Sequence, residues 1–187
     1  MNDFDQIAML LLIIVPLAGS LAMMFMPGNE AKETWYFAIF ISGLSLILAL
    51  IVFAGYDYDQ GGFQYLSSYE WLPGPLDIKL SLGIDGISAP MVLLNGIVLF
   101  GGVLISQTIT HRPRDFFVLL FALAAGVNGV FVARDLFFLF FFYELAVLPM
   151  YLLIGVWGSS TDFGTFLRTK EYGAMKLLLF LVAGSIL

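Results

Sequence analysis

Five apolar runs constrain this sequence more than any other feature. They cover residues 7–26, 35–55, 86–107, 116–132 and 136–157. A helix of about 20 apolar residues crosses the ~30 Å hydrocarbon core of a bilayer. Only 12% of the 187 residues are charged, against about 25% in a soluble domain. The sequence therefore predicts an all-α polytopic membrane protein.

A sixth apolar run begins at residue 172 and reaches the end of the sequence at residue 187. It is shorter than the ~20 residues that a crossing needs. We therefore expect five complete transmembrane helices and the start of a sixth. Residues 1–187 are expected to form a single membrane domain, the amino-terminal part of a longer subunit.

The longest polar stretch, residues 56–84, separates the second and third apolar runs. Apolar residues alternate with Lys79 and its polar or small neighbours along residues 76–82, the period of a half-buried strand. The turn-forming sequence Pro73-Gly74-Pro75 precedes this arm, and residues 63–72 would form the other arm. We predict a small β-hairpin on the membrane surface; a ligand-binding lid is the alternative. Asp85 then follows, where it can cap the third helix.

The basic residues are distributed unequally between the loops. The loops after the first, third and fifth runs contain Lys32, Arg112, Arg114, Arg168 and Lys170, whereas the other side contains Lys79 and Arg134. Short cytoplasmic loops are enriched in Lys and Arg. This predicts a multi-pass protein of the cell inner (plasma) membrane, with the N-terminus and the extracytoplasmic hairpin outside.

Glu144 is the first candidate functional residue, because it interrupts the fifth apolar run. At 1.5 Å per residue it lies roughly 14 Å beyond Asp135, near the bilayer centre. A charge there costs about 3 kcal/mol or more, and intramembrane acids commonly mark ion or proton paths. Pro149 should kink the helix near this site and free the carbonyl of Leu145. The alternative is a structural acid bonded to a neighbouring helix.

Lys176 is the second candidate, about one turn into the sixth apolar run. It could transfer protons between the cytoplasmic side and Glu144. Alternatively its long stem could lift the ammonium to the interface. We interpret Arg168, Lys170 and Glu171 as a solvated loop and His111 as a surface residue. A separate group of aromatic residues is expected to pack or to mark the interface: Tyr143, Tyr151 and Trp157.

Several site classes are excluded by composition. The chain has no Cys and one His, so it cannot supply thiolate ligands to an iron–sulfur cluster, and a metal site is not expected. It has no glycine-rich nucleotide motif, and its net charge of −6 does not favour nucleic acid. We predict no cofactor in this chain.

Three stretches, residues 81–91, 140–158 and 174–187, carry a resemblance to a known family. The Asp-Gly-Ile-Ser sequence that begins at Asp85 and the Glu144–Pro149 spacing are its most specific parts. The chain resembles the amino-terminal part of the antiporter-like chain M (chain 4) of proton-translocating NADH:quinone oxidoreductase, respiratory complex I.

The resemblance implies a fourteen-helix subunit built from inverted repeats. It implies that Glu144 begins a hydrophilic proton path that later lysines and an acid complete. It further implies that NADH, flavin, iron–sulfur clusters and quinone bind partner subunits. The expected neighbours are other membrane-arm subunits and the lipid bilayer. Two alternatives remain: a chain of a multisubunit cation/proton antiporter or membrane-bound hydrogenase, and a structural membrane scaffold.

Overall fold

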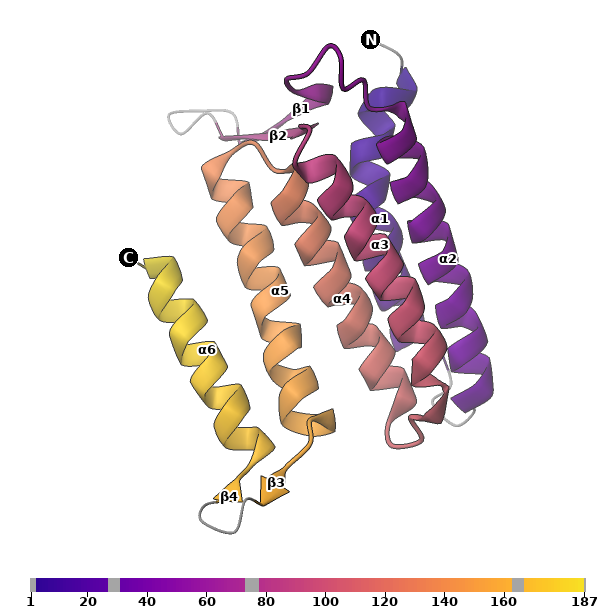
Figure 1. The fold of residues 1–187 in the computed structure, drawn as a ribbon, viewed down its shortest axis with the longest axis vertical. Helices are drawn as coiled ribbons and strands as arrows, with labels where there is room; N and C mark the ends of the chain where they lie inside the picture. The colour runs from indigo at the N-terminus through magenta and orange to yellow at the C-terminus, as the bar shows by residue number, and fades with distance from the viewer. Residues whose placement is uncertain (1–2, 27–30, 73–77, 163–166, 187) are drawn as a thin grey trace.

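The computed structural model describes residues 3–26, 31–72, 78–162 and 167–186 of the chain. Within these residues, the chain forms α-helices, one 3-10 turn and two pairs of strands (Figure 1). The elements are α1 (Asp3–Met24), α2 (Ala31–Gly55), β1 (Gln64–Leu72), β2 (Ile78–Ile84), α3 (Ser88–Ile105), the 3-10 turn η1 (Ser106–Thr108), α4 (Pro113–Val132), α5 (Leu136–Trp157), β3 (Thr161–Asp162), β4 (Leu167–Arg168) and α6 (Lys170–Ile186).

Five of the described helices, α1 to α5, are long and apolar enough to cross a membrane. This confirms the polytopic class. The helix α6 has 17 residues and is not among the five. The bounds of α5 match the expected run of residues 136–157. By contrast, α2 begins four residues before residue 35, so Lys32 and Glu33 lie in its first turn and not in a loop.

The five long helices stand side by side, and α4 has a central position among them (Figure 1). It packs against α1 and α5, and also contacts α2 and α3. The helix α6 lies at the edge of the bundle against α5. A helix that packs on several neighbours needs small residues where backbones approach closely.

Two glycines make the close contact between α4 and α5 possible. A Cβ atom on Gly126 would lie 2.8 Å from the backbone nitrogen of Ala146, and one on Gly129 would lie 2.3 Å from the ring of Phe142. Neither position leaves room for a side chain, so these glycines set the distance between the two helices.

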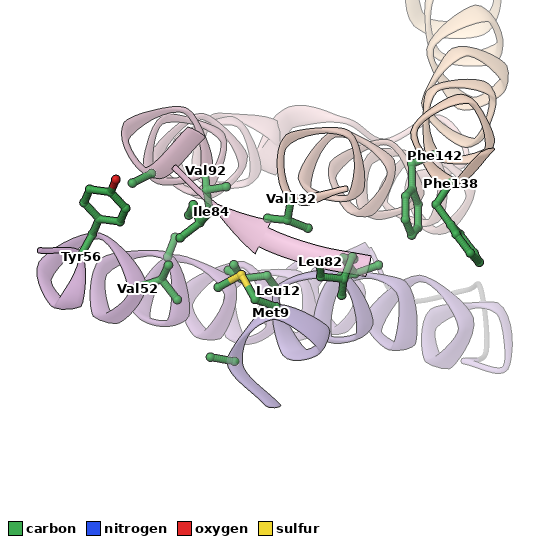
Figure 2. Packing of buried hydrophobic residues seen from close by; sticks show 14 residues of the cluster. Met9, Leu12, Val52, Tyr56, Leu82, Ile84, Val92, Val132, Phe138 and Phe142 are labelled. Carbon is green, nitrogen blue, oxygen red and sulfur yellow. The ribbon is translucent and has the colours of Figure 1, made fainter. Parts of the chain in front are cut away.

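The strands β1 and β2 pair antiparallel across one end of the bundle, with Ser67 opposite Leu82 and Tyr69 opposite Leu80 (Figure 1). Leu82 and Ile84 are fully buried among helix residues such as Met9 (Figure 2). The strand pair is therefore packed into the end of the bundle. The expected turn Pro73-Gly74-Pro75 lies outside the described residues. The extracytoplasmic position of the hairpin stays a prediction.

The hairpin is also joined to the turn between α4 and α5. The backbone N–H of Arg134 donates to the carbonyl of Ser81 at 2.9 Å, beside a β-bridge between Leu82 and Ala133. The Arg134 guanidinium lies 4.5 Å from the ring centroid of Phe63, a cation–π contact. The start of α5 is thus held by the hairpin.

A second, shorter strand pair links α5 to α6, with Thr161 opposite Arg168 and Asp162 opposite Leu167. We had interpreted Arg168, Lys170 and Glu171 as a loop. In the structure Arg168 lies in β4, and Lys170 and Glu171 lie in the first turn of α6. Two residues per strand are too few for an alternating pattern to show in the sequence.

Candidate functional site

Glu144 lies in α5, eight residues after Leu136 and roughly 12 Å along the helix. Its side chain is half-buried. The helix begins at a capped position, because one carboxylate oxygen of Asp135 accepts hydrogen bonds from the backbone of Phe137 at 2.9 Å and Phe138 at 3.4 Å. An N-cap satisfies donors that the first turn leaves free. Asp135 therefore fixes where α5 starts and, with it, the depth of Glu144.

The partner of Glu144 comes from α6. The Ser185 hydroxyl donates to Oε1 of Glu144 at 3.2 Å, and it also lies within donor range of the Val182 carbonyl at 2.9 Å. The neighbouring Tyr143 hydroxyl donates to the Leu181 carbonyl at 3.4 Å. Sequence reasoning did not select Ser185. The only signal was a small polar residue in an otherwise apolar run, and such residues are common at helix contacts.

No basic side chain in the described part of the chain forms an ion pair with Glu144. Lys176, the other predicted site residue, is exposed on α6, with its Nζ 5.8 Å from the ring centroid of Tyr172. Nine residues, or roughly 13.5 Å of helix, separate it from Ser185. The structure therefore does not bring Lys176 to Glu144, and its role in proton transfer stays a prediction.

Pro149 is buried inside α5, which continues to Trp157. It lies five residues beyond Glu144, on a different side of the helix at 3.6 residues per turn. The kink and the free carbonyl that we expected from Pro149 stay a prediction.

Two amides, Asn95 and Asn128, form a polar contact between three helices of the bundle. Asn95 of α3 donates to Oδ1 of Asn128 at 2.8 Å, and Asn128 of α4 donates to the carbonyl of Leu12 in α1 at 2.8 Å. Asn128 is 5% exposed. A buried amide is costly unless it is bonded, so this chain of amides fixes three helices relative to one another.

A cavity of about 410 Å³ lies between α3, α4, α5 and α6. Its lining is apolar apart from Asn95 and Tyr143. Tyr143 precedes Glu144, so the cavity lies next to the site, although Glu144 does not line it. Among the described residues, no three His, Asp or Glu side chains gather to hold a metal ion.

The ends of the helices are fixed by side chains that lie outside the spans. Asp85 accepts hydrogen bonds from the backbone N–H of Ile87 at 3.1 Å and of Ser88 at 2.7 Å, and from the Ser88 hydroxyl. Asp85 thus binds donors at the start of α3 as expected, although it lies three residues before Ser88 and Ile87 directly precedes the helix. The Ser88 hydroxyl, followed by these backbone donors, holds the pKa of the Asp85 carboxyl below its usual value.

We had expected Lys170 to be a solvated loop residue, and the structure contradicts this expectation. Its Nζ donates to the carbonyl of Val156 at 2.6 Å, in the last turn of α5. A cation there complements the negative end of the helix dipole. Trp157 Nε1 donates to the carbonyl of His111 at 2.9 Å, which joins α5 to the loop before α4. His111 itself is exposed, in agreement with a surface residue.

No protein-family model matches the chain. It is 34% identical over 176 residues to NAD(P)H-quinone oxidoreductase chain 4-2 of Synechocystis sp., covering 94% of this chain and 30% of that protein. It is 31% identical over 187 residues to the chloroplastic chain 4 of Chara vulgaris, covering 100% of this chain and 36% of that protein. The chain thus spans about a third of the length of these relatives.

Among solved structures, the membrane-bound sulfane sulfur reductase, an archaeal respiratory membrane complex, contains a chain with the same fold. The match has a TM-score of 0.76 and 21% sequence identity, and it covers 97% of this chain and 35% of that one. At this identity the likeness shows the fold alone. The sequence matches go further: over 94–100% of its length, this chain is 31–34% identical to homologues named NAD(P)H-quinone oxidoreductase chain 4.

Proposed function

We propose that this chain is part of a proton-translocating membrane-arm subunit of NADH:quinone oxidoreductase, and that Glu144 carries a proton within it. One observation carries the proposal: a carboxylate lies well inside an apolar spanning helix of a chain related to chain 4. A permanent charge at that depth is unfavourable. A carboxylate that alternates between charged and protonated states can exchange protons along a path.

The surroundings of Glu144 support this role. Its hydrogen-bond donor is a neutral hydroxyl, so neither protonation state is locked by an ion pair within the described residues. This chain spans about a third of the length of its relatives. The partner cation that coupling requires would come from another part of the subunit. NADH, flavin, iron–sulfur clusters and quinone would bind other subunits. We propose that the chain lies in the inner membrane with its N-terminus outside.

The test replaces the carboxylate in the assembled complex. Glu144→Gln keeps the shape and cannot ionise, so we expect at least a tenfold loss of quinone-coupled proton pumping in membrane vesicles. Glu144→Asp keeps the acid one methylene further back and should retain part of the activity. The control is Glu171→Gln, which removes an exposed carboxylate from the first turn of α6.

Pumping is followed with a pH-sensitive dye, and NADH:quinone turnover is measured on the same vesicles. Normal rates of both in an assembled Glu144→Gln complex would contradict the proposal and favour a structural scaffold.

A further inference from the structure

The Ser185 hydroxyl faces two acceptors at once. Its oxygen lies 3.2 Å from Oε1 of Glu144 and 2.9 Å from the carbonyl oxygen of Val182. A serine hydroxyl has one proton to donate and lone pairs that accept. It can therefore donate to only one of these two oxygens at any moment, and the protonation state of Glu144 decides which.

When Glu144 is ionised, its oxygens only accept, so the Ser185 hydroxyl donates to the carboxylate. Such a charge-assisted bond is about twice as strong as a neutral one. When Glu144 is protonated, its own O–H can donate to the Ser185 oxygen. The serine proton then turns to the Val182 carbonyl, which forms the ordinary bond of a serine to its own helix.

We propose that Ser185 is a positioning residue for the Glu144 proton site, and that its hydroxyl reverses direction each time Glu144 gains or loses a proton. The only covalent bond that forms or breaks is the O–H bond on Glu144. The serine proton stays on its own oxygen and rotates about the Cβ–Oγ bond. The inference rests on the proposed function of Glu144 and adds the group that adjusts its proton affinity.

On the helices α4 and α6, which pack against α5, the other titratable groups lie at the ends away from this contact. On α4 they are Arg114 and Asp115, in its first turn. On α6 they lie in the first two turns and comprise Lys170, Glu171, Tyr172 and Lys176. On α5 itself, Tyr143 donates to the Leu181 carbonyl, and Tyr151 lies two turns beyond Glu144. Within the described residues, Ser185 supplies the side-chain hydrogen bond to the carboxylate.

The experiment uses the assembled complex in vesicles and measures proton pumping as a function of pH. Ser185→Ala removes the hydroxyl donor to the carboxylate, and the bond to the charged form is the stronger of the two bonds described above. We expect the pH profile to move upward by about one unit, the size of one hydrogen bond to a charged group. Ser185→Thr keeps the hydroxyl and should keep the wild-type profile. Ser185→Cys has a weak donor and should fall between the two.

The matched control is Ser106→Ala. Ser106 is also half-buried near a helix end, and its hydroxyl donates to the carbonyl of Gly102, four residues earlier. The acceptor of its hydroxyl is a carbonyl and not a carboxylate. Its replacement should therefore leave the profile unchanged. If Ser106→Ala moves the profile as far as Ser185→Ala, the effect is general and the proposal is overturned.

Infrared difference spectroscopy supplies a second readout. The carbonyl band of the protonated carboxyl is assigned by its loss in Glu144→Gln, and it should shift in Ser185→Ala and return in Ser185→Thr. An unshifted band and an unchanged profile in Ser185→Ala overturn the role of Ser185, while loss of pumping in Glu144→Gln still supports the proposed function. Normal pumping in Glu144→Gln overturns both. A shift that Ser185→Thr does not reverse indicates altered packing and also overturns the role of Ser185.

Discussion

Single residues at the two ends of α5 help to position Glu144. Asp135 caps α5, and Lys170 donates to a carbonyl in the last turn of the same helix. The helix that holds Glu144 is thus fixed at both ends by charged side chains in polar surroundings. Each charge matches the sign of the helix dipole at its end of α5.

Asp85 allows this kind of contact to be tested through pH. Because its pKa is lowered in the folded chain from a usual value of 3.8, its charged form favours folding. That contribution is present above about pH 4 and is lost as the pH falls through the folded-state pKa. We expect Asp85→Ala to destabilise the protein by about 1 kcal/mol at pH 7.

The difference between wild type and Asp85→Ala should shrink below about pH 4. It can be measured by detergent titration of the chain in mixed micelles, followed by tryptophan fluorescence at both pH values. Asp59→Ala, in an exposed turn, is the control. A difference that is equally large at acid pH would show that the charge of Asp85 is not what stabilises the cap.

At the scale of elements, the sequence predicts the features of a helix that depend only on the residues of that helix and its flanks. The bounds of α5 follow from an apolar run with Asp135 before it and Gly158 after it. Contacts between segments do not follow in this way. The approach of Ser185 to Glu144 depends on how α6 is rotated and tilted against α5, and nothing within either helix encodes that geometry alone. The carbonyl contact of Lys170 was missed for the same reason.

The contact between α4 and α5 gives a prediction at this scale. In Gly126→Ala the new methyl group would lie 2.8 Å from the backbone of Ala146, so the helices must move apart. We expect a loss of about 1–3 kcal/mol of stability. The control is Gly101→Ala, where nothing lies within 4 Å.

Gly101→Ala should leave stability unchanged or raise it by up to about 1 kcal/mol, because alanine favours a helix more than glycine does. Both variants can be compared by the detergent midpoint of unfolding. Equal midpoints would mean that the α4–α5 distance is not set by Gly126.

The whole molecule has two different ends, and its orientation in the membrane can be tested. The basic residues predict that the β3–β4 end faces the cytoplasm and the β1–β2 end faces outward. The chain has no Cys, so single cysteines report position without a background. Gln60→Cys and Ser160→Cys are suitable because both sites are exposed, whereas Ser67 in the hairpin is only 6% exposed.

In intact cells, a membrane-impermeant maleimide should label Gln60→Cys, and it should label Ser160→Cys only after the membrane is opened. Labelling in the opposite order would reverse the orientation that we propose and would place the hairpin in the cytoplasm.

The bond from Asn128 to the carbonyl of Leu12 joins residues 116 positions apart, and this has a consequence for synthesis. In hydrocarbon, an amide without a partner costs several kcal/mol. The ribosome completes α1 long before α4. Pro16 has no N–H, so the Leu12 carbonyl lacks the usual helical donor four residues later, and it receives the Asn128 amide instead. The Asn128 amide also needs its partner when α4 enters the lipid. The first helix must therefore still be beside the insertion site at that moment, and it acts as a template that receives the fourth.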